Sequence, residues 1–377
     1  MQKHKILHVI ERFNVAGAEV VIKDLLCLFE DSIYEFHVCV LHDKGIIGTE
    51  MSERGFPVHH IDWSQDGLKD SDVIKRMRKL IEDIQPEIIH AHNITPWLFT
   101  TWATLGNKKI NRCVTLHGFL VGNGAWKKKI LYALLSRATD RVAIVSPQIR
   151  EQLKTIPFFP LQRVEVIPNG IQTETEHPQE FDATVKRAEL GLHEDNFVIG
   201  TVGRMFAEKN FEMQIRLIAR LRCSYPHLKL VIVAKKYDYF KVLEELVTSL
   251  GVEDQVVFTG LRRDVPELLQ IFDLFVMTSF SEGTSIALLE AMAAGLAVVV
   301  SDVGGNGDVV RHGHNGLLFN VHDFDDLSEK VATLIDDSFQ RRRLASGAKN
   351  TAENYNFASM KNKYESFYKA VLSAHAN

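Results

Sequence analysis

The sequence has few cysteines, and their spacing argues against the common cysteine-built sites. Only four occur among 377 residues, and no two of them form a C-x-x-C pair. Each lies among apolar neighbours, which favours buried free thiols in a reducing compartment over disulfides or a zinc site. The four are Cys27, Cys39, Cys113 and Cys223.

Two further absences limit where the protein is expected to act. No window approaches the roughly 18 apolar residues that indicate a membrane-spanning helix, and no small-residue cleavage site follows the first apolar run. The formal net charge of −4 gives no indication of nucleic-acid binding. We therefore expect a cytoplasmic protein, at most in peripheral contact with the inner face of a membrane.

The sequence does contain a regular alternation of short apolar runs and longer amphipathic stretches, which predicts parallel βαβ units. The expected strands are residues 5–10, 36–41, 58–61, 87–91, 113–116, 142–145, 197–202, 228–233, 255–258, 274–277 and 297–300. The expected helices are residues 18–29, 70–84, 96–105, 126–136, 212–222, 239–250 and 285–294.

The length and the break in this alternation predict two domains. Chains of this length usually form domains of roughly 100–200 residues, and the pattern is interrupted at Pro168-Asn169-Gly170. We predict an α/β fold of two Rossmann-like doubly wound lobes facing across a cleft, residues 1–170 and 171–355. A helical tail, residues 356–377, is expected to pack back on the first lobe. Because such sheets bind ligands outside the carboxyl ends of their strands, the chemistry is expected in loops that follow strands.

The strongest chemical signal follows the strand expected at residues 274–277. Glu282 lies in the loop, Gly283 allows the backbone to approach a ligand closely, and Thr284 is suited to cap a helix starting around Ser285. The amides at the start of a helix can hold an anion such as a phosphate. The alternative is that Glu282 has only a local structural role in the loop.

Glu290 lies about a turn and a half into the same helix, inside the otherwise apolar run 286–294. A carboxylate accepts two hydrogen bonds, which suits the neighbouring hydroxyls of a ribose. A solvated surface glutamate is the alternative, but it is less expected in an apolar run.

Two cations and one glycine follow other expected strands. Arg204 and Lys209 come after the strand at residues 197–202, where a guanidinium fork and an ammonium group could neutralise a diphosphate without metal. Two ordinary surface cations are the alternative. Gly17, at the turn from the first strand into the first helix, could admit a phosphate or could serve only the turn.

In their order and spacing these motifs resemble the retaining glycosyltransferases of family four (glycosyl transferases group 1), which have the GT-B fold. The resemblance covers essentially the whole chain. It is carried by Gly17-Ala18-Glu19, His117-Gly118, Pro168-Asn169-Gly170, Gly203-Arg204 with Lys209, Phe258-Thr259-Gly260, Glu282 with Glu290, and Asp302-Val303-Gly304-Gly305.

The resemblance implies a role for each matched residue. Arg204 and Lys209 would hold the donor diphosphate, and Glu290 would bind the nucleotide ribose. Glu282 and His117 would lie beside the donor sugar as the catalytic pair. Further substrate contacts would come from the start of the helix, at Gly283, Thr284, Ser285 and Ile286.

The same resemblance implies an activity. A hexosyltransferase would move a sugar from a nucleotide-diphosphate sugar, with a UDP-sugar favoured, to a glycan, lipid-linked or small-molecule acceptor. The first lobe would bind the acceptor and the second the donor, no metal or other cofactor would be required, and the product would serve cell-surface polysaccharide or glycoconjugate synthesis. A nucleotide-sugar 2-epimerase on the same fold and a non-catalytic two-lobed binding protein are the alternatives.

The chain departs from the family pattern at three places. Ala16 stands where a first glycine is usual, and residues 234–238 replace a glycine-rich loop, which leaves the contacts of the base open. Residues 306–308 replace a hydrophobic-proline-glutamate motif, for which we have no physical account.

Three other features have competing interpretations. His90 and His92 share one face of a strand by alternation, so a zinc site with His117 is conceivable, although satisfied histidines are more frequent. Asp70-Ser71-Asp72 resembles a metal-binding D-x-D, but its place at a helix start favours capping. The helix that begins at Trp126 carries three successive lysines that could contact an anionic membrane or could simply be solvated. They are Lys127, Lys128 and Lys129.

Overall fold

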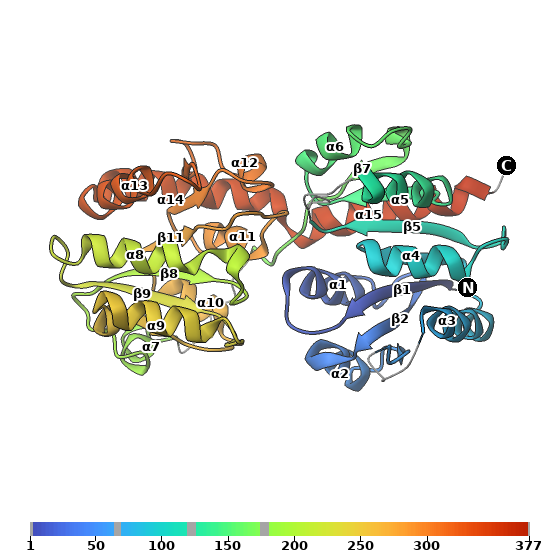
Figure 1. Ribbon diagram of the computed structural model, residues 1–377, viewed down its shortest axis with the longest axis horizontal. Helices are drawn as coiled ribbons and strands as arrows, with labels where there is room; N and C mark the ends of the chain where they lie inside the picture. The colour runs from blue at the N-terminus through green and yellow to red at the C-terminus, as the bar shows by residue number, and fades with distance from the viewer. Residues whose placement is uncertain (1–2, 64–68, 119–125, 174–180, 376–377) are drawn as a thin grey trace. The chain divides into compact units, whose positions relative to one another are not determined.

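A computed structural model describes residues 3–63, 69–118, 126–173 and 181–375 (Figure 1). The chain divides into two compact units. One combines Met1–Gly170 with Phe357–Asn377, and the other is Ile171–Asn356.

Within the described residues the first unit is built on a seven-stranded parallel sheet of order β3-β2-β1-β4-β5-β6-β7. The first strand has the burial pattern that such a sheet requires. Its residues from Ile6 to Ile10 are buried without interruption, as expected for a strand of a parallel sheet that is covered on both faces. The strands are β1 (His4–Arg12), β2 (Tyr34–Asp43), β3 (Val58–His60), β4 (Ile88–His92), β5 (Asn111–Leu116), β6 (Arg141–Ile144) and β7 (Val164–Val166).

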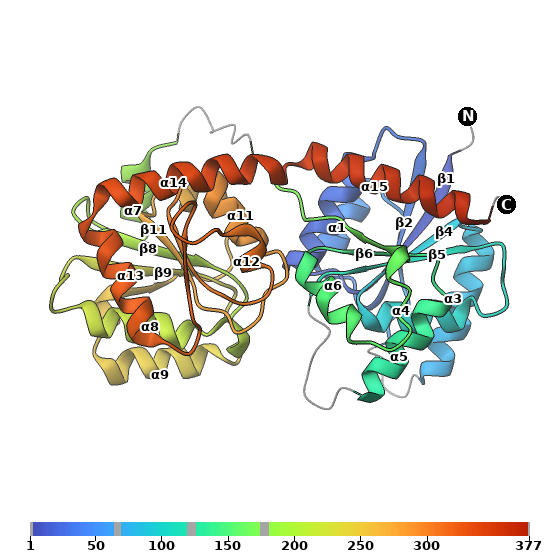
Figure 2. The same ribbon diagram turned by 90° about the horizontal axis from the view of Figure 1, so that it is seen from above.

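Helices cover both faces of this sheet, with α1 and α15 on one side and α3, α4 and α5 on the other (Figure 2). In α3 the buried residues Val73, Met77 and Ile81 recur every four positions and form one apolar stripe toward the sheet. The helices are α1 (Gly17–Leu28), α2 (Gly45–Glu53), α3 (Asp70–Ile84), α4 (Ile94–Ala103), α5 (Trp126–Arg137), α6 (Pro147–Lys154) and α15 (Phe357–Leu372).

The second unit is built on a parallel sheet of order β10-β9-β8-β11-β12-β13, in the part of the chain that the structure describes. The strands are β8 (Phe197–Val202), β9 (Leu228–Val233), β10 (Val256–Phe258), β11 (Leu274–Met277), β12 (Val298–Ser301) and β13 (Leu317–Phe319). The helices are α7 (Ala183–Glu189), α8 (Phe211–Leu221), α9 (Phe240–Leu250), α10 (Val265–Gln270), α11 (Ile286–Ala293), α12 (Asn306–Val309), α13 (Phe324–Asp336) and α14 (Ser338–Ala352).

Two apolar cores hold this second unit together, one on each face of its sheet. Helices α8, α9 and α13 pack on one face (Figure 2), and α10, α11 and α14 pack on the other. The prediction of an α/β fold with two Rossmann-like sheets is therefore confirmed.

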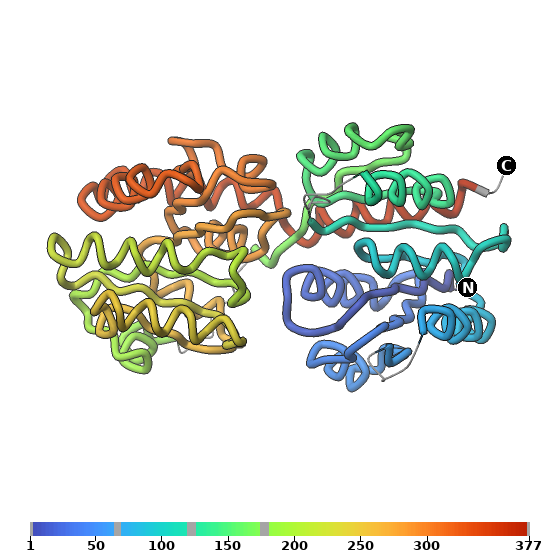
Figure 3. The backbone as a smooth tube through the Cα atoms, in the orientation of Figure 1, coloured from blue at the N-terminus to red at the C-terminus, as the bar shows by residue number. Residues whose placement is uncertain are grey.

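The C-terminal helix α15 belongs to the first unit, where it lies beside β5 and α1 although it ends the chain (Figure 3). Its buried face presents Tyr364, Phe367 and Tyr368 to the sheet. The Gly170 amide donates a 3.2 Å hydrogen bond to Sδ of Met360 on this helix.

Some expectations about single residues were wrong. Cys39 and Cys113 are buried and all four thiols are free, but Cys27 is only partly buried and Cys223 is exposed. Cys223 lies in the turn after α8, beyond the last buried residue of that helix, so the apolar residues around it in sequence do not cover it.

Candidate functional site

The predicted phosphate-binding residues lie at the topological switch point of the second sheet. Strand order reverses between β8 and β11, which are neighbours in the sheet but are separated in sequence by two strands. Arg204 and Lys209 follow β8, and Glu282 follows β11. Open α/β sheets bind ligands at this crevice, outside the carboxyl ends of the strands.

A partly buried ion pair joins these two loops. Lys209 Nζ lies 2.7 Å from Glu282 Oε1, and the two side chains are 19% and 7% exposed. The Ser279 hydroxyl donates a 2.6 Å hydrogen bond to the same carboxylate oxygen. A buried charge is tolerated only when it is paired and hydrogen-bonded, so Lys209 and Ser279 together hold Glu282 in place.

Backbone contacts fix the same two loops to each other. The Phe280 amide donates to the Glu208 carbonyl at 2.9 Å, and the Thr278 hydroxyl donates to the Asn210 carbonyl at 2.8 Å. Asn210 itself has φ +50°, a left-handed conformation that asparagine tolerates better than most residues. The position of Lys209 is thus set by its backbone as well as by its ion pair.

The helix after Glu282 begins one residue later than predicted. Ser285, not Thr284, is the N-cap of α11, and its hydroxyl accepts a hydrogen bond from the Leu288 amide at 3.4 Å. Thr284 is buried in the preceding loop instead. Gly295 follows the last turn with φ +76°, as expected of a helix-ending glycine.

The loop after β12 packs directly on the loop that carries Glu282. The Gly305 amide donates to the Glu282 carbonyl at 3.0 Å. A Cβ at position 305 would lie 2.3 Å from the Gly283 carbonyl oxygen, a distance that no side chain could accept. Gly305 therefore permits the close backbone approach that shapes the turn before α11.

Arg204 is the more exposed cation. Its Nη2 lies 3.6 Å from Glu208 Oε1, and its guanidinium lies over the Phe206 ring with 5.2 Å to the centroid. Phe206 in turn stacks on Tyr237 from the loop after β9, with 4.9 Å between centroids. The side chain is thus supported by an aromatic pair while its charge stays accessible.

Glu290 lies in the second turn of α11 and is half-buried, on a helix whose other residues are mostly buried and apolar. It is therefore not a fully solvated glutamate. The carboxylate that lies 2.7 Å from Lys209 Nζ is that of Glu282.

In the first unit, Gly17 is the first residue of α1, and Ala16 is its N-cap. A Cβ at position 17 would meet nothing within 4 Å. Packing within the protein therefore does not require glycine here, and the open space leaves room for a ligand.

His117 follows β5 and takes part in a buried chain of side-chain hydrogen bonds, here called the histidine chain. His117 Nε2 lies 2.9 Å from His92 Nδ1, and His92 Nε2 lies 2.9 Å from His8 Nδ1. His8 Nε2 then lies 3.4 Å from the hydroxyl of Tyr368 on α15. The His117 amide is held separately by Asn93 Oδ1 at 2.9 Å.

The histidine chain continues beyond Tyr368. The Tyr368 hydroxyl lies 2.9 Å from His90 Nδ1, and His90 Nε2 lies 2.7 Å from the Thr115 hydroxyl. The Thr115 hydroxyl lies 3.3 Å from that of Tyr364, where the chain ends.

Burial keeps these imidazoles neutral. It lowers the pKa of His8 to about 3 and that of His117 to about 4. The pKa values of His90 and His92 are also lowered, first by burial and then by the neighbouring histidines. The charged form is disfavoured because the rings have lost their contact with water.

A metal could be held by three histidines of this chain, but they are not the predicted three. The ring nitrogens that lie close together belong to His8, His90 and His92, with His117 outside the group. His90 and His92 do share one side of the sheet, with 4.3 Å between their centroids. Every ring nitrogen of the group already has a hydrogen-bond partner, which a metal would have to replace.

The structure describes two surface features whose interpretation the sequence left open. Asp70 and Asp72 lie in the first turn of α3, where Asp72 accepts a 3.4 Å hydrogen bond from the Lys69 amide, as capping predicts. On α5, Leu134 is 55% exposed, whereas its sequence neighbour Leu135 is buried. Trp126, Ile130 and Leu134 recur every four residues and form an exposed apolar stripe.

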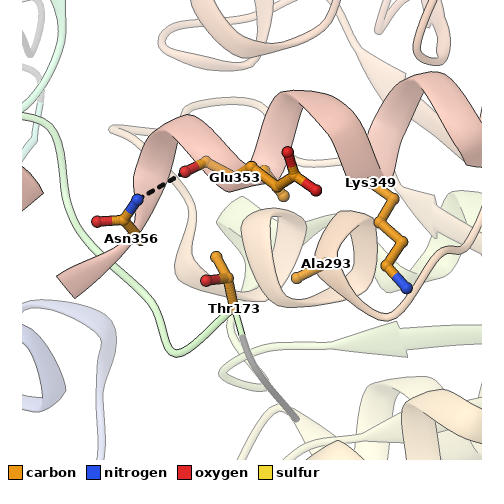
Figure 4. A pocket seen from close by; sticks show the side chains of 6 residues that line it. Thr173, Ala293, Lys349, Glu353 and Asn356 are labelled. Carbon is orange, nitrogen blue, oxygen red and sulfur yellow. Dashed lines mark hydrogen bonds between the residues drawn. The ribbon is translucent and has the colours of Figure 1, made fainter. Parts of the chain in front are cut away.

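A small pocket lies elsewhere in the second unit, with a volume of about 280 Å³ (Figure 4). Ala293 at the C-terminal end of α11 lines it together with Lys349 and Glu353 of the α14 segment. The predicted phosphate site is at the opposite, N-terminal end of α11, so the pocket is a separate feature.

Two residues that complete these arrangements were not anticipated from the sequence. Ser279 donates a hydrogen bond to Glu282, three residues further along the chain, and His8 pairs with His90 in the register of β1 and β4. Gly305 was recognised as part of a motif, but its contact with Gly283 was not predicted. The Rossmann strand order would have placed His8 beside His90, but the order had to be assumed.

Known proteins match both units. The model for Glycosyltransferase Family 4 matches residues 15–175, and the model for glycosyl transferases group 1 matches residues 182–351. The Escherichia coli UDP-Gal:alpha-D-GlcNAc-diphosphoundecaprenol alpha-1,3-galactosyltransferase is 28% identical over 288 residues, 72% of each chain. The Bacillus anthracis N-acetyl-alpha-D-glucosaminyl L-malate synthase is 23% identical over 87% of this chain and 94% of its own.

A solved structure shares the fold over nearly the whole chain. The structure of Anabaena HepE in complex with UDP and glucose has a TM-score of 0.86 and 22% sequence identity, covering 97% of this chain and 100% of that one.

The contact of Gly305 with Gly283 generates a testable prediction. Gly305→Ala should force the turn before α11 to move, lowering the free energy of unfolding by about 1–3 kcal/mol. It should also weaken binding of a nucleoside diphosphate at least about tenfold, which corresponds to 1.4 kcal/mol. Chemical denaturation and calorimetry measure the two effects.

Gly347→Ala is the matched control, because its Cβ would lie 2.3 Å from the His314 carbonyl oxygen, away from this turn. It should destabilise the protein without weakening nucleotide binding. If Gly305→Ala and Gly347→Ala bind the nucleoside diphosphate with equal affinity, the turn before α11 is not part of the nucleotide site.

Proposed function

Because the chain belongs to the family-four glycosyltransferases of the GT-B fold and is an enzyme of the hexosyltransferase type, we propose that it transfers a hexosyl unit from a UDP-sugar with retention of anomeric configuration. The observation that carries the proposal is the Lys209–Glu282 pair at the switch point, beside the start of α11. A relative named for a UDP-galactose donor and a fold neighbour bound to UDP support the choice of nucleotide.

The donor is bound by the second unit in this proposal. Lys209 and Arg204 contact the diphosphate, together with backbone amides at the start of α11. Glu290 accepts hydrogen bonds from the ribose hydroxyls. Glu282, already oriented by Ser279, accepts hydrogen bonds from hydroxyls of the transferred sugar and so sets its position.

The reaction follows from where charge develops. As the bond from the anomeric carbon to the diphosphate breaks, positive charge grows on the sugar and negative charge on the leaving phosphate. Arg204, Lys209 and the helix start stabilise the negative charge at the place where it forms. The acceptor hydroxyl attacks from the face that the phosphate leaves and gives its proton to that phosphate. His117 contributes a hydrogen bond that orients the sugar.

The acceptor belongs to the first unit in this proposal, where the open space beside Gly17 admits it. A glycan, a lipid-linked glycan or a small polyol would each supply the attacking hydroxyl. We favour a place in cell-surface polysaccharide or glycoconjugate synthesis, which the undecaprenol-linked acceptor named for the Escherichia coli relative supports.

A transfer assay in the presence of EDTA tests this function. The wild-type protein, supplied with UDP-hexoses and glycan or lipid-linked acceptors, should form product with EDTA present, because Lys209 and Arg204 supply the charge that a metal would otherwise supply. Proton NMR of the first-formed product should show the anomeric configuration of the donor. Loss of activity in EDTA with rescue by magnesium or manganese, or an inverted product, would contradict the mechanism.

We also propose that α5 brings the enzyme to an anionic membrane. Among the residues described by the structure, no helix is long and apolar enough to cross a bilayer. The exposed stripe of Trp126, Ile130 and Leu134 lies beside successive lysines, a pattern suited to the interface of an anionic bilayer.

Sedimentation with phosphatidylglycerol vesicles measures this contact. The wild type should bind, and changing Lys127, Lys128 and Lys129 together to Glu should abolish binding. The control changes three exposed lysines of the second unit, Lys235, Lys236 and Lys241, to Glu and should leave binding intact. Equal losses in both variants would mean that only net charge matters.

A further inference from the structure

The histidine chain must have a direction, because a neutral imidazole carries one N–H donor and one acceptor nitrogen. Each link between two rings therefore needs a donor on one side and an acceptor on the other. If one ring changes its tautomer, all the connected rings must change with it. The histidine chain consequently has two self-consistent states. In one, the hydrogen that no member of the histidine chain accepts is on His117, and in the other it is on Tyr364.

The surroundings of the two ends differ. Tyr364 is 1% exposed, and within the described residues its hydroxyl has only the Thr115 hydroxyl as a partner. If Thr115 donated to Tyr364, the Tyr364 O–H would be a buried donor without an acceptor, and His117 Nδ1 would be a buried acceptor without a donor. His117 lies at the carboxyl end of β5 and is partly exposed as a residue, although its Nδ1 atom is buried. In the opposite direction His117 Nδ1–H is the one group of the histidine chain left unpaired among the described residues, so that direction leaves fewer buried polar groups without a partner.

The direction is therefore from Tyr364 toward His117. The Tyr364 hydroxyl donates to Thr115, and the Thr115 hydroxyl donates to His90 Nε2. His90 Nδ1–H donates to the Tyr368 oxygen, whose own hydrogen is donated to His8 Nε2.

The remaining links follow in the same sense. His8 Nδ1–H donates to His92 Nε2, and His92 Nδ1–H donates to His117 Nε2. The hydrogen of His117 then lies on Nδ1, a buried atom that has no partner among the described residues. Within the histidine chain, this N–H is the donor that a ligand oxygen could accept from.

We propose that the histidine chain fixes His117 in the Nδ1–H tautomer and so presents a hydrogen-bond donor to an oxygen of the transferred sugar. His8, His92 and Tyr368 act as positioning residues, and α15 thereby takes part in substrate recognition. This inference rests on the proposed function for the identity of the ligand, whereas the tautomer itself is a property of the free protein. Imidazole in water favours the Nε2–H tautomer, so the assignment is not the default one.

Nitrogen-15 NMR of histidine-labelled, ligand-free, full-length protein tests the tautomer directly. Nδ1 of His8, His92 and His117 should each show the shift of a protonated ring nitrogen, and Nε2 that of an unprotonated one. An Nε2–H tautomer at His117 would overturn the proposal. Stoichiometric zinc in the purified protein, lost on changing His8, would overturn it as well, because the metal would occupy the ring nitrogens.

His8→Asn breaks the chain with little change of shape. The asparagine amide can place either its oxygen or its nitrogen where His8 Nδ1 meets His92, so it accepts either tautomer of that ring. His92 and His117 should then show the Nε2–H form. His59→Gln is the matched control, since His59 Nε2 belongs to a separate histidine pair with His37 in the same sheet, 3.2 Å apart. It should leave His117 unchanged.

Activity gives the second readout. With the preferred UDP-sugar, His8→Asn should lower kcat about three- to tenfold, the equivalent of one neutral hydrogen bond, with an unchanged Kd for free UDP. A fall in UDP affinity of the same size, or an equal loss of kcat in His59→Gln, would identify a merely structural role and refute the proposal. If His8→Asn does not fold, Tyr368→Phe takes its place and should raise the Nε2–H fraction of His117, and an unchanged fraction would refute the proposal.

The proposed transfer function and the proposed tautomer of His117 can be refuted separately. A wild-type protein without transfer activity or UDP binding would defeat the proposed function, whereas the tautomer of His117 would still be decided by the spectrum.

Discussion

The ion pair between Lys209 and Glu282 is the interaction on which the second unit's site depends. It connects the loops after β8 and β11 at the point where strand order reverses, and it leaves Glu282 only 7% exposed. Two charges at this depth lose much of their hydration, which their mutual attraction and the Ser279 hydrogen bond offset. Such a pair contributes little net stability, but it fixes geometry, and fixed geometry is what a site that stabilises developing charge requires.

The backbone of the surrounding loops also fixes the geometry of this site. Gly305 allows the loop after β12 to approach Gly283 closely, and Asn210 adopts the left-handed turn that delivers Lys209. These contacts are made before any ligand arrives. A diphosphate that binds here would therefore meet cations and amides already in position, and little of the binding energy would be lost in ordering them.

Much of this arrangement could be predicted from the sequence, because it depends on local patterns. The alternation of apolar and amphipathic segments indicated both sheets, and the positions of Arg204, Lys209 and Glu282 directly after strands indicated which loops carry charge. The edge strands β7 and β13 were not predicted, although the equally short edge strands β3 and β10 were. The helix start at Ser285 was misplaced by one residue because threonine and serine cap helices almost equally well.

What the sequence could not show depends on contacts between distant segments. The histidine chain joins residues from β1, β4, β5 and α15, and His8 and Tyr368 are 360 positions apart. The direction of hydrogen donation along the histidine chain was inferred from the burial of Tyr364 at its far end, and no local sequence pattern indicates that burial. The exposure of Leu134 on α5 likewise depends on which face of the helix meets the sheet, and an apolar side chain does not by itself reveal it.

Calorimetric titration with UDP tests the central claim most directly, namely that the switch-point loops of the second unit bind a nucleoside diphosphate. The wild type should bind UDP in EDTA. Lys209→Met should weaken binding about 10- to 100-fold through loss of charge-assisted bonds of about 1.5–3 kcal/mol, and Glu290→Ala at least about tenfold. Lys330→Met is the control, because Lys330 is also 19% exposed and also paired with a carboxylate, that of Asp326 on α13. The affinity of Lys330→Met for UDP should equal that of the wild type. Unchanged affinity for UDP in Lys209→Met and Glu290→Ala would place the nucleotide elsewhere and contradict the account.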